Sequence, residues 1–124
     1  MKFTFNISSI GGQIVRIDLK GRLLSGDEAK TLLEAADQEL TEGKNRFVIN
    51  LKELEFVNSA GLSSLISLLT KARNKSGEVA IYGTNKRLEE LIILTKLNTV
   101  FNIFKSEDEA LKEINKKESA KKIK

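Results

Sequence analysis

The sequence has no cysteine and no histidine among its 124 residues. Without cysteine, disulfides, a thiol nucleophile and cysteine-ligated metals are excluded. Without histidine, the usual zinc sites, the Ser-His-Asp triad and imidazole acid–base catalysis are excluded too. No phosphate loop of the form G-x-x-x-x-G-K-[ST] or G-x-G-x-x-G occurs. We therefore expect a protein that is not an enzyme and that binds no metal and no cofactor, although the composition still allows an enzyme that uses only carboxylates or a lysine.

Proline and long apolar runs are absent as well. A helix that spans a bilayer needs about 20 consecutive, mainly apolar residues, and no run approaches that length. The chain shows no internal repeat and no linker, and its length suits one domain. We expect a cytoplasmic protein that does not insert into membranes.

The net charge of +4 comes from the end of the chain. Residues 115–124 hold five lysines and one glutamate, so the other 114 residues are formally neutral. A nucleic-acid-binding domain should instead carry a basic patch on its folded body, with aromatic or base-reading side chains nearby. We predict a domain at residues 1–114, a flexible basic tail at 115–124, and no direct contact with nucleic acid.

The spacing of apolar residues predicts a regular alternation of strands and helices. Residues 3–7 and 13–19 alternate apolar and polar side chains on either side of Gly11-Gly12, which is typical of a β-hairpin. The order ββαβαβαβα predicts an α/β fold with a mixed β-sheet of about four to five strands and helices packed on it. Further strands are expected at 47–51, 79–82 and 100–104, and helices at about 25–43, 59–74, 85–94 and from 106 onward.

Small polar residues stand where the third strand leads into the second helix, in the stretch VNSAGL at 57–62. In α/β sheets, ligand and partner sites gather at the carboxyl ends of strands. Asn58 or Ser59 can cap the helix, which contributes about 1 kcal/mol. Ala60 and Gly61 add almost no bulk, so a partner could approach Ser59 closely. The stretch alone is consistent with a cap or with a contact site.

The helix after this turn separates apolar from small polar side chains. Its apolar face, which should pack on the sheet, comprises Leu62, Leu65, Leu69 and Ala72. A neighbouring stripe comprises Ser59, Ser63, Ser67 and Thr70, with Ile66 at its edge. Another protein could approach such a stripe, which could equally be an ordinary exposed face.

A phosphate on Ser59 would have a clear physical effect. The helix N-terminus offers free N–H groups and the positive end of the helix dipole, so it tolerates an added charge of about −1.5 to −2. A partner packed over the turn would have to desolvate that anion. One hydroxyl could therefore switch binding without changing the fold.

The segment FVINLKELEFVNSAGLSSLISLL resembles the core of STAS domains, the fold of bacterial anti-sigma factor antagonists. In that family a hydrophobic strand leads into an Asp-Ser-(Ser/Thr/Ala)-Gly-Leu turn that opens a helix. The later stretch GEVAIYGTNKRLEELIILTKLNTVFNIFKSEDEAL is also similar, with a Gly before a strand, a helix, a Leu-rich turn and a closing strand followed by x-x-E-A. The resemblance covers residues 1 to about 114.

The resemblance implies a non-enzymatic binding module. Such antagonists bind an anti-sigma factor that is also a serine kinase of the GHKL type, and they are inactivated when that kinase phosphorylates the turn serine. That position falls on Ser59, with a serine phosphatase as a further partner. Asn58 replaces the family's aspartate, so it can still cap the helix but carries no charge. The predicted partner-binding residues are Asn58, Ser59, Ala60, Gly61, Leu62, Ser63, Ile66 and Ser67.

Two rival hypotheses remain. A constitutive STAS scaffold or subunit, of the lipid-transport or stressosome type, would use the turn only for docking, and Asn58 favours that alternative. A small α/β enzyme or phosphoaspartate receiver would need an acidic cluster at the strand ends to hold Mg²⁺. The predicted strand ends offer Asn50, Asn58 and Gly83 instead, which disfavours a receiver.

Overall fold

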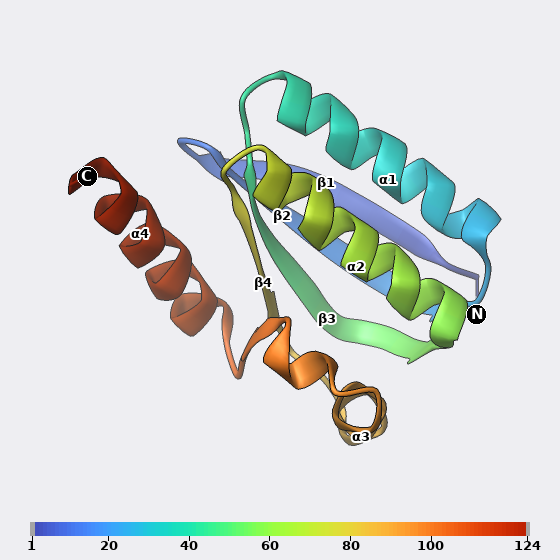
Figure 1. Cartoon of the computed structure of the whole chain (residues 1–124). Helices are drawn as coiled ribbons and strands as arrows, with labels where there is room; N and C mark the ends of the chain where they lie inside the picture. The colour runs from blue at the N-terminus through green and yellow to red at the C-terminus, as the bar shows by residue number, and fades with distance from the viewer. Residues whose placement is uncertain (1, 124) are drawn as a thin grey trace.

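Strands and helices alternate along the chain in the predicted order (Figure 1). The computed structural model describes residues 2–123, with side chains described for residues 2–115. The strands are β1 (Thr4–Gly11), β2 (Ile14–Leu23), β3 (Arg46–Val57), β4 (Glu78–Tyr82) and β5 (Asn102–Phe104). The helices are α1 (Gly26–Thr41), α2 (Ser59–Asn74), α3 (Lys86–Leu94) and α4 (Glu107–Ile123), with a 3₁₀ turn at Leu97–Thr99.

The five strands form one mixed sheet in the order β1-β2-β3-β4-β5. β1 and β2 pair antiparallel, as expected of a hairpin, and the remaining neighbours pair parallel. This arrangement confirms the predicted α/β class, the mixed sheet and the element order. The parallel strands β2 and β3 end at the same edge, where β3 leads into α2.

The two faces of the sheet are covered by different helices. On one face a large core joins β2 and β3 to α1 and α2, which lie side by side (Figure 1). Successive residues of a strand point to opposite faces, so Phe47 and Ile49 enter this core while Val48 enters the other. The smaller core beneath α4 comprises Ile14, Val48, Ala80, Tyr82, Ala110 and Ile114.

β3 is longer than the sequence predicts, because β2 continues to pair with it after β4 has ended. Along β3, only residues 46–50 pair with β4, whereas pairing with β2 continues as far as Val57. Beyond Leu51 one side of β3 is open to solvent, and Lys52 and Glu55 are exposed while Leu54 stays buried. The uninterrupted apolar run therefore stops before the strand does, and the predicted end at residue 51 is wrong.

The last strand is shorter than the predicted 100–104. Lys96 adopts a left-handed backbone with φ of 63°, and the chain then forms the 3₁₀ turn at Leu97–Thr99. The Phe101 N–H donates to the Leu97 carbonyl at 2.9 Å, and Val100 has a helical backbone. Only Asn102–Phe104 is left to pair with β4.

α2 packs on the sheet through a wider face than predicted. The four predicted residues are buried, and so are three others in the same helix. The additional residues are Gly61, Ser64 and Leu68. Ser64 is accommodated because its hydroxyl donates to the Ala60 carbonyl at 3.1 Å.

α4 begins at Glu107 and its backbone continues to Ile123, into the segment predicted as a tail. The side chains from residue 116 onward lie outside the described residues, so the boundary at 114 and the flexible tail remain predictions. Within the described part of the chain, no helix is both long enough and apolar enough to cross a bilayer.

A polar cluster joins the first turn of α4 to the sheet. One carboxylate oxygen of Glu107 accepts from the Tyr82 hydroxyl at 2.8 Å and from Arg16 at 3.2 Å. Arg16 also forms an ion pair with Asp18 at 3.4 Å, and Asp18 accepts from the Asn50 amide at 2.8 Å. Burial is the main cause of a raised Tyr82 pKa, and the hydrogen bond to Glu107 and its negative charge raise the pKa further.

We expect Glu107→Gln to lower the Tyr82 pKa, because the substitution removes the nearby negative charge but leaves the ring buried. The chain has one tyrosine and no tryptophan, so phenolate absorbance reports this group alone. Because the Tyr82 pKa is higher in the folded state than in the unfolded state, the neutral phenol stabilises the fold. This contribution is complete below the ordinary value of 10.0 and is lost as pH rises through the folded pKa. An equal Tyr82 pKa in Glu107→Gln and the parent protein would contradict the prediction.

Candidate functional site

The turn between β3 and α2 is built around Asn58. Its side-chain carbonyl accepts from the Gly61 N–H at 2.9 Å, and its backbone carbonyl accepts from the Leu62 N–H at 2.9 Å. Its amide donates to the Leu24 carbonyl at 2.9 Å, and its backbone N–H donates to the Leu23 carbonyl at 3.3 Å. Asn58 is thus the cap of α2 and ties the turn to the end of β2.

Ser59 follows the cap as the first residue of α2, and its side chain is exposed. Within the described part of the chain, the hydroxyls of Ser59 and Ser63 make no hydrogen bond, whereas the Ser67 hydroxyl donates to the Ser63 carbonyl at 3.2 Å. The Thr70 hydroxyl likewise donates to the Ile66 carbonyl at 3.1 Å. The hydroxyls nearest the start of the helix are therefore those free to meet another molecule.

The eight predicted partner-binding residues lie together at the first turns of α2, at different depths. The exposed ones are Ser59, Ala60, Ser63 and Ser67. Asn58 and Ile66 are half-buried, while Gly61 and Leu62 are buried in the core. Gly61 and Leu62 therefore shape the turn from beneath and present no side chain at the surface.

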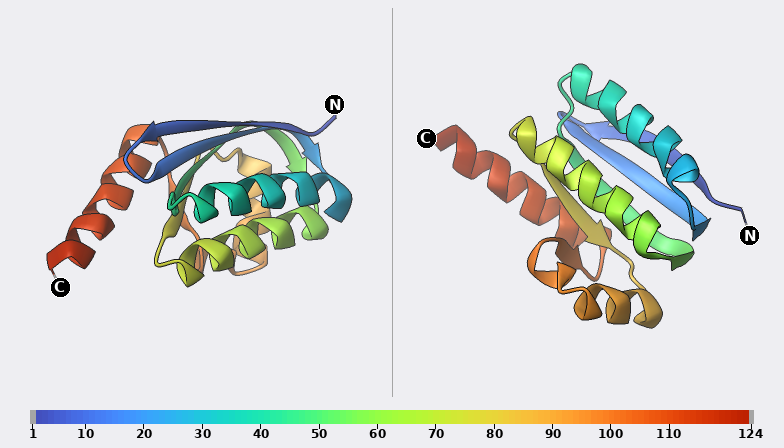
Figure 2. Two further views of the ribbon diagram at one scale, coloured as in Figure 1. Left: turned by 90° about the horizontal axis from the view of Figure 1, so that it is seen from above. Right: turned by 45° about the vertical axis from the view of Figure 1, so that its right-hand side comes forward.

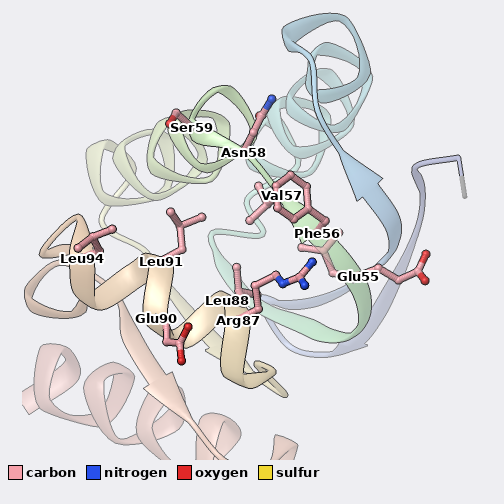
Figure 3. A pocket seen from close by; sticks show the side chains of 11 residues that line it. Glu55, Phe56, Val57, Asn58, Ser59, Arg87, Leu88, Glu90, Leu91 and Leu94 are labelled. Atoms are coloured by element: carbon pink, nitrogen blue, oxygen red, sulfur yellow. The ribbon is translucent and has the colours of Figure 1, made fainter.

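An apolar groove of about 590 Å³ opens beside the turn, between the end of β3 and α3 (Figure 3). Leu91 extends from α3 toward the side of the groove where Asn58 and Ser59 lie. Leu94 is 82% exposed, and Leu24, whose carbonyl binds Asn58, is also exposed. The groove is lined by Leu54, Glu55, Phe56, Val57, Asn58, Ser59, Arg87, Leu88, Glu90, Leu91 and Leu94.

Sequence reasoning missed the α3 side of this groove. Leu88 and Ile92 form the buried stripe that an amphipathic helix needs, and Leu91 is half-buried at its side. Ile93 and Leu94 are apolar too, so the helix has more apolar residues than one stripe accounts for. That excess of apolar residues in the sequence was the signal that α3 has an exposed apolar surface suited to binding another molecule. Among the described residues, no group of three or more acidic side chains could hold a metal ion.

The family model for the STAS domain matches residues 10–110, which include β2, the turn and the groove. The chain belongs to the STAS domain family. A candidate anti-sigma factor antagonist from Thermotoga maritima is 26% identical over 81 residues, which make up 65% of this chain and 72% of the relative. A homologous protein of Thermotoga neapolitana is 27% identical over 78 residues, covering 63% and 69%.

Solved structures of anti-sigma factor antagonists share the fold of this STAS domain. One from Mycobacterium paratuberculosis superposes with a TM-score of 0.78 at 20% identity, over 92% of this chain and 95% of its own. SpoIIAA in its unphosphorylated form gives 0.72 at 14% identity, over 90% and 98%. The Bacillus cell fate determinant SpoIIAA in its phosphorylated form gives 0.70 at 15% identity, over 90% and 99%.

Asn58 stands where the STAS turn usually has an aspartate, and its contacts explain what the amide does in this STAS domain. The Leu24 carbonyl requires a donor, which an ionised carboxylate cannot provide. An aspartate would still cap α2, but one of its oxygens would lie against that carbonyl. The asparagine therefore has a structural reason, which the sequence alone could not reveal.

We expect Asn58→Asp to lower the free energy of unfolding by about 1 kcal/mol, because the hydrogen bond from the amide to the Leu24 carbonyl is replaced by two facing acceptors. The gain from a negative charge at the helix N-terminus, roughly 0.3–1 kcal/mol, only partly offsets this loss. Urea unfolding of both proteins measures the difference.

Asn85 provides a matched comparison for this substitution. It caps α3 by accepting from the Leu88 N–H at 2.8 Å, and its amide donates to the Leu54 carbonyl at a longer 3.3 Å. Asn85→Asp should therefore cost less than Asn58→Asp. If Asn58→Asp is as stable as the parent, the amide contact with Leu24 does not hold the turn.

Proposed function

We propose that this STAS domain is a non-enzymatic regulator of the anti-sigma factor antagonist type. It binds an anti-sigma factor that is also a serine kinase of the GHKL type, through residues 58–63 and the exposed side of α2. Phosphorylation of Ser59 by that kinase releases the complex, and a serine phosphatase restores binding. The observation that carries the proposal is the exposed Ser59 hydroxyl, without a hydrogen bond to any described residue, at the edge of an apolar groove.

The position of Ser59 suits a reversible charge. The N-terminus of a 16-residue helix lies beneath it, with no acidic residue in the first turn to repel a phosphate. Transfer of the γ-phosphoryl group of ATP to the Ser59 hydroxyl forms the phosphoester and ADP and releases the hydroxyl proton. The kinase supplies the catalytic groups for this step, so this chain needs no catalytic residue of its own.

The apolar groove supplies the contact area that a single turn lacks. Leu91 and Leu94 on α3 face the turn across the groove, and Leu24, whose carbonyl accepts from the Asn58 amide, is exposed. Apolar side chains of a partner that fill such a groove contribute most of the affinity of an interface. A phosphate on Ser59 would place a hydrated anion at the rim of that contact.

The relatives support the same class of function. The Thermotoga maritima relative is described as a candidate anti-sigma factor antagonist, and SpoIIAA has both an unphosphorylated and a phosphorylated form on this fold. The regulatory step that we propose for Ser59 therefore has a counterpart in a protein of the same architecture.

The test is phosphorylation by an anti-sigma factor kinase from the same genome, followed by mass spectrometry of peptides. We expect ATP-dependent addition of one phosphate to Ser59, none to Ser59→Ala, and normal labelling of Ser63→Ala, which lacks the other exposed hydroxyl near the turn. Equal labelling of Ser59→Ala and the parent protein would show that Ser59 is not the acceptor.

A further inference from the structure

β1 forms an open edge of the sheet with unpaired backbone hydrogen-bonding groups. The order of strands places β2 on one side of β1 and no strand on the other. In Figure 2, left, β1 runs along the rim of the molecule, and no helix lies beyond it. Such an edge can accept a further strand, from another molecule, through the same backbone hydrogen bonds that pair β1 with β2.

The usual protections of an edge strand are missing from most of β1. The eight residues Thr4–Gly11 include no charged residue, and the chain has no proline. The ladder with β2 is regular from Thr4 to Ser9, and its one irregularity lies between Ser9 and Gly11. The opposite edge differs, because β5 has only three residues and α4 packs against it.

Two apolar side chains of β1 that face the large core are only partly covered. Phe5 and Ile7 point toward the large core but stay half-buried, since α1 packs over β2 rather than over β1. On the other face Thr4 and Asn6 are exposed and Ser8 is half-buried, all of them short and uncharged. A strand added beside β1 would meet apolar groups on one face and small polar groups on the other.

We infer that β1 pairs antiparallel with β1 of a second copy of this chain, which joins two sheets into one continuous sheet. The two-fold axis passes through Asn6, inside the regular stretch from Thr4 to Ser9. In this register Phe5 faces Ile7 of the second copy, and Ile7 faces its Phe5, which gives two apolar cross-strand pairs. Asn6 faces its own counterpart, so the two amides can hydrogen-bond across the axis.

A second copy suits this edge because the edge is compatible with itself. Two uncharged strands do not repel each other, and the antiparallel arrangement satisfies the same contacts twice in one closed interface. Lys2, the charged residue nearest to β1 along the sequence, lies at opposite ends of the two paired strands. The inference does not depend on Ser59, since the turn and the groove lie away from this edge.

Sedimentation velocity of the full chain over a range of concentrations tests the inference, and we expect a reversible monomer–dimer equilibrium. Asn6→Lys places two positive charges opposite each other and should raise the dissociation constant about tenfold. Asn98→Lys, the same change at an exposed position beyond α3, should leave the constant within about twofold. A protein that is monomeric at every concentration, or equal effects of the two substitutions, would overturn the inference.

Single cysteines test the register, because the chain has none of its own. Directly opposite residues in an antiparallel pair have Cα atoms about 4.5–5.5 Å apart, a separation that a disulfide can bridge. Asn6→Cys should therefore oxidise to a covalent dimer. Thr4→Cys should remain uncrosslinked, because its counterpart lies four residues away along the strand, at about 13 Å. Crosslinking of Thr4→Cys in preference to Asn6→Cys would rule out this pairing.

Discussion

Replacing Gly61 with alanine is expected to lower the free energy of unfolding by about 2–3 kcal/mol, the cost of overpacking a core without room for a methyl group. A Cβ at position 61 would lie 2.5 Å from a methyl carbon of Val57, 2.6 Å from the Leu23 carbonyl oxygen and 2.8 Å from the Leu23 Cγ. The Val57 methyl can rotate away. The Leu23 carbonyl cannot, because it belongs to β2 and accepts from the Asn58 N–H.

The Gly61→Ala substitution therefore forces the start of α2 away from β2, and it displaces the turn that carries Ser59. Gly26→Ala is the matched control, since no heavy atom lies within 4 Å of a Cβ at that position. It should leave stability unchanged or raise it by about 0.5 kcal/mol. Urea unfolding compares the two variants, and similar stabilities would show that Gly61 is not required for close packing of α2.

Replacing Ser59 with glutamate is expected to weaken binding to the anti-sigma factor about 100-fold, which corresponds to about 2.7 kcal/mol. The glutamate adds a charged, hydrated group at the rim of the apolar groove, where a bound partner would have to desolvate it. The fold should tolerate the change, because Ser59 is exposed and a negative charge is favourable at a helix N-terminus.

Calorimetric titration of the anti-sigma factor measures this effect. Thr31→Glu adds the same charge at an exposed position of α1 and should bind like the parent protein. If Ser59→Glu also binds like the parent, the turn is not a switch. The constitutive scaffold, in which the docking surface lies elsewhere or is indifferent to charge, would then be the better account.

Much of the fold follows from local patterns in the sequence. The alternation of residues 3–7 and 13–19 predicts the hairpin, and the succession of strand and helix periods predicts the mixed sheet that the structure contains. These features could be predicted because they depend on neighbours within a few residues. The ends of β3 and β5 could not, because they depend on which strands continue to pair and on a left-handed residue at Lys96.

The site divides in the same way. The cap at the start of α2 and the exposed hydroxyl of Ser59 could be read from the stretch VNSAGL. The contact of Asn58 with Leu24 spans 34 residues of sequence, and the groove brings β3 against α3, so neither has a local signature. Gly61 illustrates both cases. Its small size is visible in the sequence, but the Leu23 carbonyl that leaves no room for a side chain there belongs to β2, far away along the chain.

The most direct test of the central claim is to map the surface that binds the anti-sigma factor. Isotope-labelled protein is titrated with the unlabelled partner in the absence of ATP, and the backbone amide resonances are followed. We predict that the largest changes occur at Ser59, Ala60 and Ser63, and across the groove at Leu94. No change on titration, or changes confined to α4 and the sheet face beneath it, would contradict the proposal that the Ser59 turn is the binding site.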